Sequence, residues 1–438
     1  MGCGASKKKE ANQAVGKAAA AAGENAAAGE QATSNGRQTL TNKKAKPPKR
    51  TQALDEESAE TIAAKVPDGQ KWTDDAFPPS EASLQLEDAV DGIMWVRPEA
   101  LCENPQLITG GYEAGDVVQG ALGSCWFLGA ISVMATRPDL LQIVIPGDQH
   151  SKKGVIAFRF YKFGRWVEVV IDDFVPTKTQ GPVFASAQDP NELWPTYIEK
   201  AYAKLHGTYQ SIVGGWVSDA LVDLTGGVPD VIYFDEDEVK EQIASGNLFD
   251  RLLKMYQSEE YLLGCAMSTS GTREADTGEG ILQGHAYGIL EVRRYKQLRM
   301  LRCRNPWGCT EWTGAYSDKD ERYWNSVDNA VMTLRGKKMS KEDGKFWMPW
   351  SEFNTYFDLV DVCAVGTSMR DLELNLNEDK GKVCGLCVGA AQGCCGFWCP
   401  TGCWRHGECE LQGCLGVRRM WFPLSKSTKD ILLENGAK

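Results

Sequence analysis

An uncharged, proline-free run at residues 126–135 is the segment that most constrains the fold of this chain. Its length suits one buried helix and falls short of the about 20 apolar residues that span a bilayer. Cys125 stands directly before it, after a turn flanked by glycines. Backbone N–H groups and the helix dipole favour a thiolate at a helix N-terminus. Cys125 is therefore predicted to be a nucleophile, although a free Cys beside Trp126 and Phe127 is also typical of a protein core.

The sequence also offers the partners that a nucleophilic thiolate requires. A His commonly holds and returns the proton, and an amide or carboxylate orients that His. Of only four histidines, His285 lies among small residues, and an alternating segment that ends at Asn305 follows it. Gln119, a turn before Cys125, is a candidate donor to an oxyanion, and Trp307 is a candidate cover for the His–Asn pair. The order Cys, His, Asn indicates nucleophilic acyl transfer.

At these residues the chain resembles the calpains, which are papain-fold intracellular cysteine proteases. The resemblance covers about residues 72–363, and its other motifs lie at residues 168–173, 198–204, 223–227, 284–287, 304–308 and 343–348. It implies an α+β, papain-like core with a helical half and an antiparallel β half. It also implies calcium-dependent limited proteolysis of intracellular proteins. The implied roles are nucleophile for Cys125, base for His285, orienting residue for Asn305 and oxyanion donor for Gln119.

Composition divides the 438 residues into four parts. Residues 1–70 are poor in aromatic and branched side chains and are predicted to be a disordered tether. Residues 71–215 are predicted to form the nucleophile half of the core and residues 216–370 the His/Asn half, with the active site between them. Residues 371–438 form a Cys-rich tail. The net charge of −11 gives the body of the protein no general reason to bind nucleic acid.

The N-terminus carries signals for attachment to a membrane. Gly2 fits the N-myristoylation pattern, and Cys3 is a candidate for S-palmitoylation. One acyl chain holds a membrane only marginally, but Lys7, Lys8 and Lys9 add attraction to anionic lipid. We expect a cytoplasmic protein that is peripheral on a membrane, either the inner leaflet of the plasma membrane or a flagellar or cortical membrane. The alternative is a flexible N-terminus with an accidental Gly-Cys pair.

The resemblance implies one calcium site in each half of the core. The implied ligands are Thr109, Gly111, Asp116 and Glu199 in the first half and Glu311, Asp318 and Asp343 in the second. At Lys345, where the family usually has a Glu, the chain loses an oxygen ligand and gains a positive charge. Ala114 replaces an Arg that commonly pairs with that Glu, so both ends of a link between the halves are absent. We therefore expect one good calcium site and one crippled site.

Eight of the 15 cysteines lie between Cys384 and Cys414, where the family resemblance has ended. Three interpretations remain open for this tail: a zinc site, an S-acylated patch, or reduced cysteines in a small domain. Cys-x-x-Cys followed by Cys-x-x-x-Cys provides thiolates for tetrahedral zinc. The candidate zinc ligands are Cys384, Cys387, Cys399 and Cys403. Disulfides are not expected in the cytosolic compartment that the N-terminus indicates.

Two hypotheses for function follow. The first is an endopeptidase that carries out limited proteolysis of protein substrates at a membrane. The second is a catalytically silent calpain-like structural or adaptor protein of a membrane or the cytoskeleton. The complete Cys, His, Asn and Gln set favours the enzyme.

Overall fold

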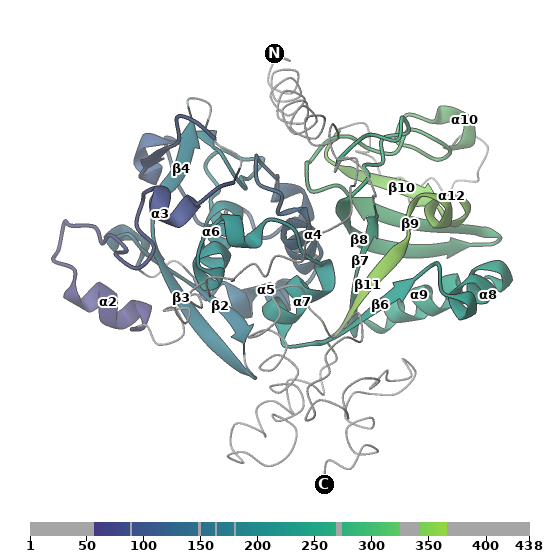
Figure 1. Cartoon of the computed structure of the whole chain (residues 1–438), viewed down its shortest axis with the longest axis horizontal. Coiled ribbons are helices and arrows are strands. Elements are labelled where there is room, and N and C mark those ends of the chain that lie inside the picture. Colours follow the sequence, from purple (N-terminus) through teal and green to yellow (C-terminus); the bar gives the residue numbers. More distant parts are fainter. Residues whose placement is uncertain are drawn as a thin grey trace, which may run out of the picture.

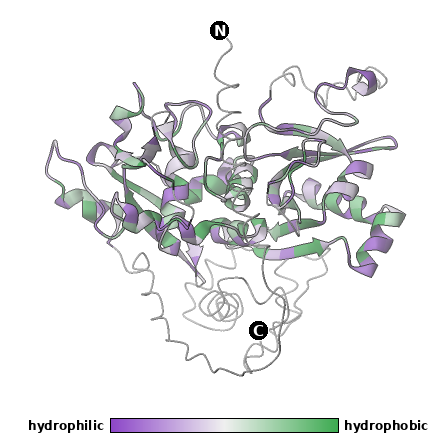
Figure 2. Ribbon diagram, turned by 45° about the horizontal axis from the view of Figure 1, so that its top comes forward, coloured by the Kyte–Doolittle hydropathy of each residue, from purple (hydrophilic) through white to green (hydrophobic). Residues whose placement is uncertain are grey.

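The computed structural model describes residues 57–87, 90–147, 150–162, 164–178, 181–268, 274–324 and 342–365. These residues form two halves side by side, one rich in helices and one built on a large sheet (Figure 1). Each half has an apolar core, and Figure 2 shows hydrophobic residues along the central helices and strands, with hydrophilic residues toward the periphery. The α+β fold class predicted from the sequence is confirmed.

Short helices surround two small antiparallel sheets in the first half. Its elements are α2 (Ala59–Lys65), α3 (Glu81–Leu84), β1 (Met94–Val96), α4 (Cys125–Met134), α5 (Pro138–Val144), β2 (Val155–Lys162), β3 (Arg165–Asp172), β4 (Val175–Lys178), β5 (Gly181–Pro182) and α6 (Trp194–His206). β2 pairs with β3, and β4 pairs with β1 and β5. Phe158 of β2 and Val169 of β3 are fully buried in the same apolar cluster as α4, so this hairpin closes the core around α4.

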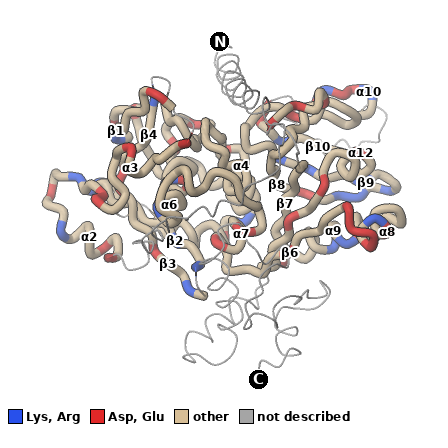
Figure 3. Tube along the Cα trace, viewed as in Figure 1, with Lys and Arg blue, Asp and Glu red and all other residues tan. Residues whose placement is uncertain are grey.

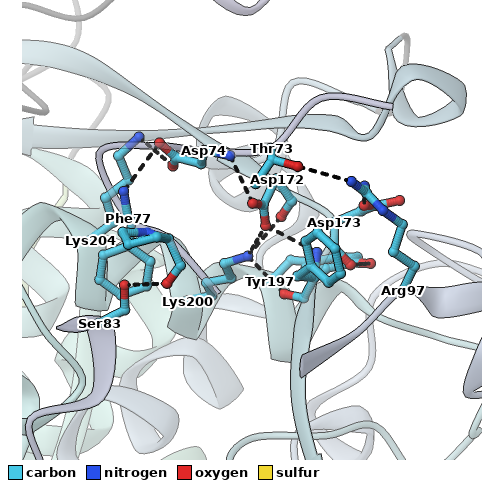
Figure 4. Close-up of polar contacts among 12 residues, drawn as sticks. Thr73, Asp74, Phe77, Ser83, Arg97, Asp172, Asp173, Tyr197, Lys200 and Lys204 are labelled. Carbon is cyan, nitrogen blue, oxygen red and sulfur yellow. Dashed lines mark hydrogen bonds and ion pairs between the residues drawn. The ribbon is translucent and has the colours of Figure 1, made fainter. Parts of the chain in front are cut away.

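Buried ion pairs connect α6 to the rest of the first half. Lys200 pairs with Asp172 at the end of β3, and Lys204 pairs with Asp74 at 2.7 Å (Figure 4). All four side chains are at most 3% exposed. A buried charge that loses its partner costs several kcal/mol, so these pairs fix how α6 sits against β3. Asp172 belongs to the family motif at residues 168–173, and Lys200 and Lys204 belong to the motif at residues 198–204. These charged residues therefore stabilise the fold rather than take part in the chemistry.

One six-stranded sheet dominates the second half. Its elements are β6 (Val228–Tyr233), α8 (Asp237–Ser245), α9 (Asn247–Ser258), β7 (Tyr261–Met267), β8 (His285–Tyr295), β9 (Leu298–Arg304), α10 (Glu321–Trp324), β10 (Lys345–Pro349), α12 (Trp350–Tyr356) and β11 (Leu359–Ala364). The strand order is β10-β9-β8-β7-β11-β6, and all neighbours are antiparallel. The strands predicted within residues 288–302 correspond to β8 and β9.

Helix α4 packs at the junction of the halves. It begins at Cys125, and every residue from Trp126 to Met134 is buried, so the helix predicted for residues 126–135 is confirmed. α4 contacts β8 of the sheet. A Cβ atom on Gly288 would lie 2.8 Å from the Val133 side chain, which requires glycine at this crossing. The close approach sets the separation between Cys125 and His285.

Helix α7 (Val217–Thr225) joins the two halves. Its residues Leu221 and Leu224 are buried in the apolar cluster that contains α4, and the helix also contacts β6 and β11 of the sheet. The boundary predicted between residues 215 and 216 therefore precedes a helix whose packing is shared by both halves.

Charged side chains of both signs are spread over the two halves (Figure 3). Asp and Glu outnumber Lys and Arg by 59 to 48 in the whole sequence, yet neither sign of charge predominates in one half (Figure 3). Among the described residues, every helix is too short or too polar to cross a membrane.

Candidate active site

Cys125 is the first residue of α4, and buried polar contacts anchor the turn before it. Ser124 is fully buried, and its hydroxyl donates to Glu199 Oε1 of α6 at 2.6 Å. The other Glu199 oxygen accepts from the Ala185 backbone N–H at 2.7 Å. Cys125 itself is partly exposed and forms no disulfide. The thiol is therefore accessible at a helix N-terminus whose position α6 holds.

His285 begins β8, and Asn305, which follows β9, orients it. His285 Nε2 lies 2.9 Å from Asn305 Oδ1, and both side chains are buried. Asn305 Nδ2 donates to the Thr310 carbonyl at 2.9 Å, which turns the amide oxygen toward the imidazole. Nε2 therefore donates the hydrogen of the His–Asn bond, and Nδ1 is left to face Cys125. A His285 ring nitrogen and the Cys125 sulfur lie within 4.8 Å of each other.

Aromatic rings enclose the imidazole. The Trp307 ring stands edge-on to His285 with centroids 5.4 Å apart, and Tyr287 packs edge-on at 5.0 Å. The Trp307 backbone N–H also donates to Asn305 Oδ1 at 3.0 Å. These contacts keep water away from the His–Asn hydrogen bond.

Direct hydrogen bonds tie the nucleophile loop to the Asn305 loop. The Gln119 backbone N–H donates to the Pro306 carbonyl at 2.9 Å. The fully buried Arg304 guanidinium donates to the Val117 carbonyl and to Ser132 Oγ of α4, the latter at 3.2 Å. Burial lowers the pKa of Arg304 to about 10, so it remains charged at neutral pH. The two catalytic loops are thereby held against each other across the junction.

Glu274 is a residue of the site that the sequence did not reveal. Its Oε1 atom lies 3.2 Å from His285 Nδ1 and accepts from Gln119 Nε2 at 3.5 Å. Gln119 Nε2 also donates to the Leu122 carbonyl at 2.8 Å. The carboxylate thus contacts Gln119, the candidate donor to the oxyanion, and His285, the candidate proton donor to the leaving amine. Nothing in the sequence around residue 274 signalled this, because the contact depends on how the following hairpin folds.

A tight hairpin aims the Glu274 carboxylate into the site. The Glu274 N–H donates to the Gln283 carbonyl at 2.6 Å, and the Gln283 N–H donates to the Ala275 carbonyl at 2.9 Å. Glu274 has a φ of 59°, a left-handed conformation that is uncommon outside glycine. The hairpin leads directly into His285, so the carboxylate and the imidazole share one rigid support.

The charges of the site raise the pKa of His285 to about 10. Burial alone would lower this pKa, but the charge of Cys125 and hydrogen bonds to Cys125 and Glu274 outweigh it, with the Glu274 charge adding to the effect. His285 is therefore an imidazolium at neutral pH when it faces a thiolate. Such an ion pair is the resting state that a cysteine nucleophile requires.

A cluster of carboxylates lies near Thr109 in the first half, but its members differ from the predicted set. Glu192 Oε1 accepts from the Thr109 backbone N–H at 2.8 Å. Burial, together with the charges of Asp116, Asp189 and Glu113, raises the pKa of Glu192 to about 7. Oxygen-rich clusters of this kind suit calcium.

Glu199, which the resemblance placed in that cluster, lies elsewhere. It is 1% exposed, and its two oxygens already accept from Ser124 and Ala185. Glu192 precedes α6, whereas Glu199 lies two helical turns further on and faces the core. The acidic residue beside Asp116 is therefore Glu192, and Glu199 positions the turn that carries Cys125.

The second half has its own acidic cluster. Glu311 Oε1 accepts from the backbone N–H groups of Asp343 and Gly344, each at 2.8 Å. Burial raises the pKa of Glu311 to about 7, with the neighbouring charge of Asp343 adding to the effect. Asp318 is also buried, at 7% exposure. Lys345 Nζ lies 3.2 Å from Asp343 Oδ2, so one carboxylate of this cluster pairs with a cation of the chain itself.

Lys345 also reaches the first half. A Cβ atom on Gly115 would lie 3.0 Å from Lys345 Nζ, which places the ammonium against the short 3₁₀ turn η4 (Ala114–Asp116). The charge of Lys345 lowers the pKa of Asp116, although burial raises it on balance. An Arg–Glu link between residues 114 and 345 is not possible with Ala114 and Lys345 at these positions, but Lys345 makes a different contact between the halves.

Several predicted sites lie outside the described residues. They are Gly2, Cys3, Lys7, Lys8, Lys9, Cys384, Cys387, Cys399 and Cys403.

Comparison with known proteins agrees with this geometry. A family described as calpain family cysteine protease matches residues 72–364. The chain is 37% identical over 330 residues to calpain-12 of Homo sapiens, covering 72% of this chain and 44% of that protein. It is also 37% identical over 310 residues to the calpain-type cysteine protease DEK1 of Zea mays, covering 68% and 14%.

The chain spans less than half the length of these two relatives. A longer match is calpain-5 of Caenorhabditis elegans, at 34% identity over 370 residues, covering 75% of this chain and 57% of that protein. The similarity therefore concerns the core described above.

Proposed function

Because the chain belongs to the calpain family of cysteine proteases, we propose that it is an endopeptidase that cleaves proteins through Cys125 and His285. One observation carries the proposal: the imidazole lies between the Cys125 sulfur and the Asn305 oxygen, with Nε2 fixed 2.9 Å from Oδ1. This arrangement favours the enzyme over a silent structural or adaptor protein, since the latter would not need an aligned nucleophile and base.

The chemistry follows from the same atoms. The Cys125 thiolate attacks the scissile carbonyl carbon, and the carbonyl oxygen becomes an oxyanion. Gln119 Nε2 and the Cys125 backbone N–H are the donors that stabilise this oxyanion. The His285 Nδ1 proton passes to the leaving amine as the peptide C–N bond breaks, which leaves a thioester on Cys125. Water then attacks the thioester, gives its proton to His285, and releases the acid and the thiolate.

Glu274 must leave its contacts for this reaction to proceed. Its carboxylate accepts a hydrogen bond from Gln119 Nε2, the group that would donate to the oxyanion. It also lies beside the Nδ1 atom that protonates the leaving amine. Substrate binding therefore displaces the Glu274 side chain.

The first test compares the wild-type protein with Cys125→Ala on a casein substrate. We expect casein cleavage by the wild type and at least a 10³-fold loss in the variant, because loss of a triad nucleophile removes most of the rate. Asn305→Ala is the companion variant and should retain more activity, since it orients rather than reacts. Cleavage that persists unchanged in Cys125→Ala would contradict the proposal.

We also propose that calcium modulates the enzyme through the first-half cluster. The support is the set of oxygen groups near Thr109 and Gly111, with Glu192 and Asp116 as the carboxylates. Burial raises the pKa of Glu192, repulsion by neighbouring carboxylates adds to the effect, and a divalent cation would relieve that repulsion. Titration of peptidase activity from a chelator upward tests this proposal, and activity that does not respond to calcium contradicts it.

A membrane location is a further proposal, and it rests on the N-terminal sequence. Gly2 and Cys3 would carry acyl chains, and Lys7, Lys8 and Lys9 would face anionic lipid. Gly2→Ala should move the protein from the membrane fraction to the soluble fraction of the cells that express it. Full membrane retention of that variant argues against acylation at Gly2.

A further inference from the structure

Three different metal-binding groups converge at the active site. Cys125 offers a sulfur, His285 a ring nitrogen and Glu274 a carboxylate oxygen, and these atoms all lie within 4.8 Å of one another. Thiolate, imidazole and carboxylate are the ligand types of zinc sites in proteins. Acid–base catalysis explains Cys125 and His285, but it gives no role to Glu274.

We propose that Cys125, His285 and Glu274 form an inhibitory Zn²⁺ site, with a fourth position open to water. This proposal rests on the proposed function, because inhibition has a meaning only for an active protease. The ligand atoms would be Sγ of Cys125, Nδ1 of His285 and Oε1 of Glu274.

The spacing of two ligands already matches tetrahedral zinc. Zn–N and Zn–O distances of about 2.0–2.1 Å give a ligand-to-ligand edge of about 3.3–3.4 Å. His285 Nδ1 and Glu274 Oε1 are 3.2 Å apart. The Cys125 sulfur lies within 4.8 Å of both atoms, and it would supply the third corner as the ligands close on the ion.

The groups behind the ligands also match a metal site. In zinc sites the second ring nitrogen of a ligating His usually donates to a carbonyl or carboxylate oxygen, which fixes the ring and makes it a better ligand. Here His285 Nε2 donates to Asn305 Oδ1 at 2.9 Å. Gln119 Nε2 supports the carboxylate at 3.5 Å. Both ligands are therefore held in place before any ion arrives.

Ligand chemistry selects the ion. A site with sulfur and imidazole nitrogen favours zinc over calcium and magnesium, which prefer oxygen ligands. Binding would expel the proton that His285 shares with Cys125, so one proton leaves for each ion that enters. The bound ion would coordinate both the Cys125 sulfur and His285 Nδ1. It would thereby block attack by the thiolate and proton transfer by the imidazole.

The test measures zinc inhibition of the full chain with saturating calcium, each variant normalised to its own activity without zinc. The variants are Glu274→Gln and, as a matched control, Glu279→Gln, which changes an exposed acid of the same hairpin that bonds to Thr313. Glu274→Gln should raise the inhibitory zinc concentration about 10- to 100-fold. Glu279→Gln should leave it unchanged. Equal inhibition of Glu274→Gln and wild type would overturn the proposal.

A spectroscopic measurement separates this site from the tail cysteines and from activity. Co²⁺ added to the wild type should give a thiolate-to-cobalt absorption band that Cys125→Ser lacks and that Glu274→Gln weakens. A band that survives in Cys125→Ser places the metal on other cysteines and overturns the proposal. A Cys125-dependent band in a protein without peptidase activity would instead overturn the proposed function and leave the metal site standing. Activity without such a band would overturn the metal site alone.

Discussion

The two acidic clusters of the core differ in what balances their charge. In the first half, burial raises the pKa of Glu192 most, and the charges of Asp116, Asp189 and Glu113 add to the effect. In the second half, Lys345 Nζ lies 3.2 Å from Asp343 and carries its positive charge into the cluster. The charge of Lys345 also lowers the pKa of Asp116 in the first cluster, although burial raises it on balance. The difference between the clusters therefore lies in direct pairing: Lys345 forms an ion pair with Asp343 of the second cluster.

This difference suggests how the halves can be aligned. Lys345 pairs with Asp343 and lies against the turn at Gly115 of the first half. An ammonium group in this place needs no calcium, so the contact between the halves at the second cluster is independent of the ion. Calcium dependence, on our proposal, would then come from the first cluster.

Among the expected effects, that of Lys345→Glu is the largest. Two unit charges 4 Å apart interact by about 4 kcal/mol at an effective dielectric constant near 20, so the reversal should strengthen calcium binding at the second cluster at least about 100-fold. Calorimetry of the full chain should then show one more bound calcium than the wild type. Lys345→Met is the control, since it removes the charge without adding a ligand. An unchanged stoichiometry in Lys345→Glu would show that the second cluster cannot hold calcium.

Glu192→Gln tests the first cluster in the same way. It keeps the shape of the side chain but removes one negative charge, and calcium affinity follows the number of charged ligands. We expect calcium affinity at the first cluster to fall about 10- to 100-fold in calorimetry. Glu199→Gln is the matched control and should leave the affinity unchanged, because Glu199 faces Ser124 and Ala185. The opposite pattern would restore Glu199 as the ligand.

Glu199→Ala tests whether Glu199 positions the turn before Cys125, in place of the calcium-binding role that the resemblance implied. The change leaves the Ala185 N–H without its acceptor and the Ser124 hydroxyl with only the longer bond to the Leu122 carbonyl at 3.5 Å, and an unpaired buried group costs about 1–3 kcal/mol. The free energy of unfolding should therefore fall by about 2–3 kcal/mol in urea denaturation. Peptidase activity should fall as well, since Ser124 precedes the nucleophile. Unchanged stability would show that the turn is held by other contacts.

The smallest expected effect is a pH dependence without calcium. Glu192 and Glu311 have pKa values of about 7 in the folded protein against an ordinary 4.5. Between these values the folded state binds more protons than the unfolded state, so both groups make stability fall as pH rises from about 4.5 to 7. Glu192→Gln should be more stable than the wild type at pH 8 and lose this advantage at pH 5. Melting temperatures in chelator at both pH values check it, and a constant difference would contradict the raised pKa.

Much of the catalytic geometry could be predicted because each motif sits on an element with a clear sequence pattern. The apolar run predicted α4 with Cys125 at its start, and the alternating segments predicted β8 and β9, which carry His285 and lead to Asn305. Glu274 could not be predicted, because its contact depends on a hairpin with a left-handed residue. Glu192 was missed because two acids lie seven residues apart around the start of α6 and the motif alone does not say which one faces Asp116.

The nucleophile helix and the order Cys125, His285, Asn305 could be derived from the residues alone, because periodicity and short-range chemistry are local properties of a chain, and the fold class followed from the family resemblance. Only the tertiary structure decided what surrounds those residues. It placed Glu274 against His285, turned Glu199 into the core and brought Lys345 against Gly115. The first two contacts lie within one half and the third crosses the junction, but all of them join residues that only folding brings together, because a buried charge without a partner is costly.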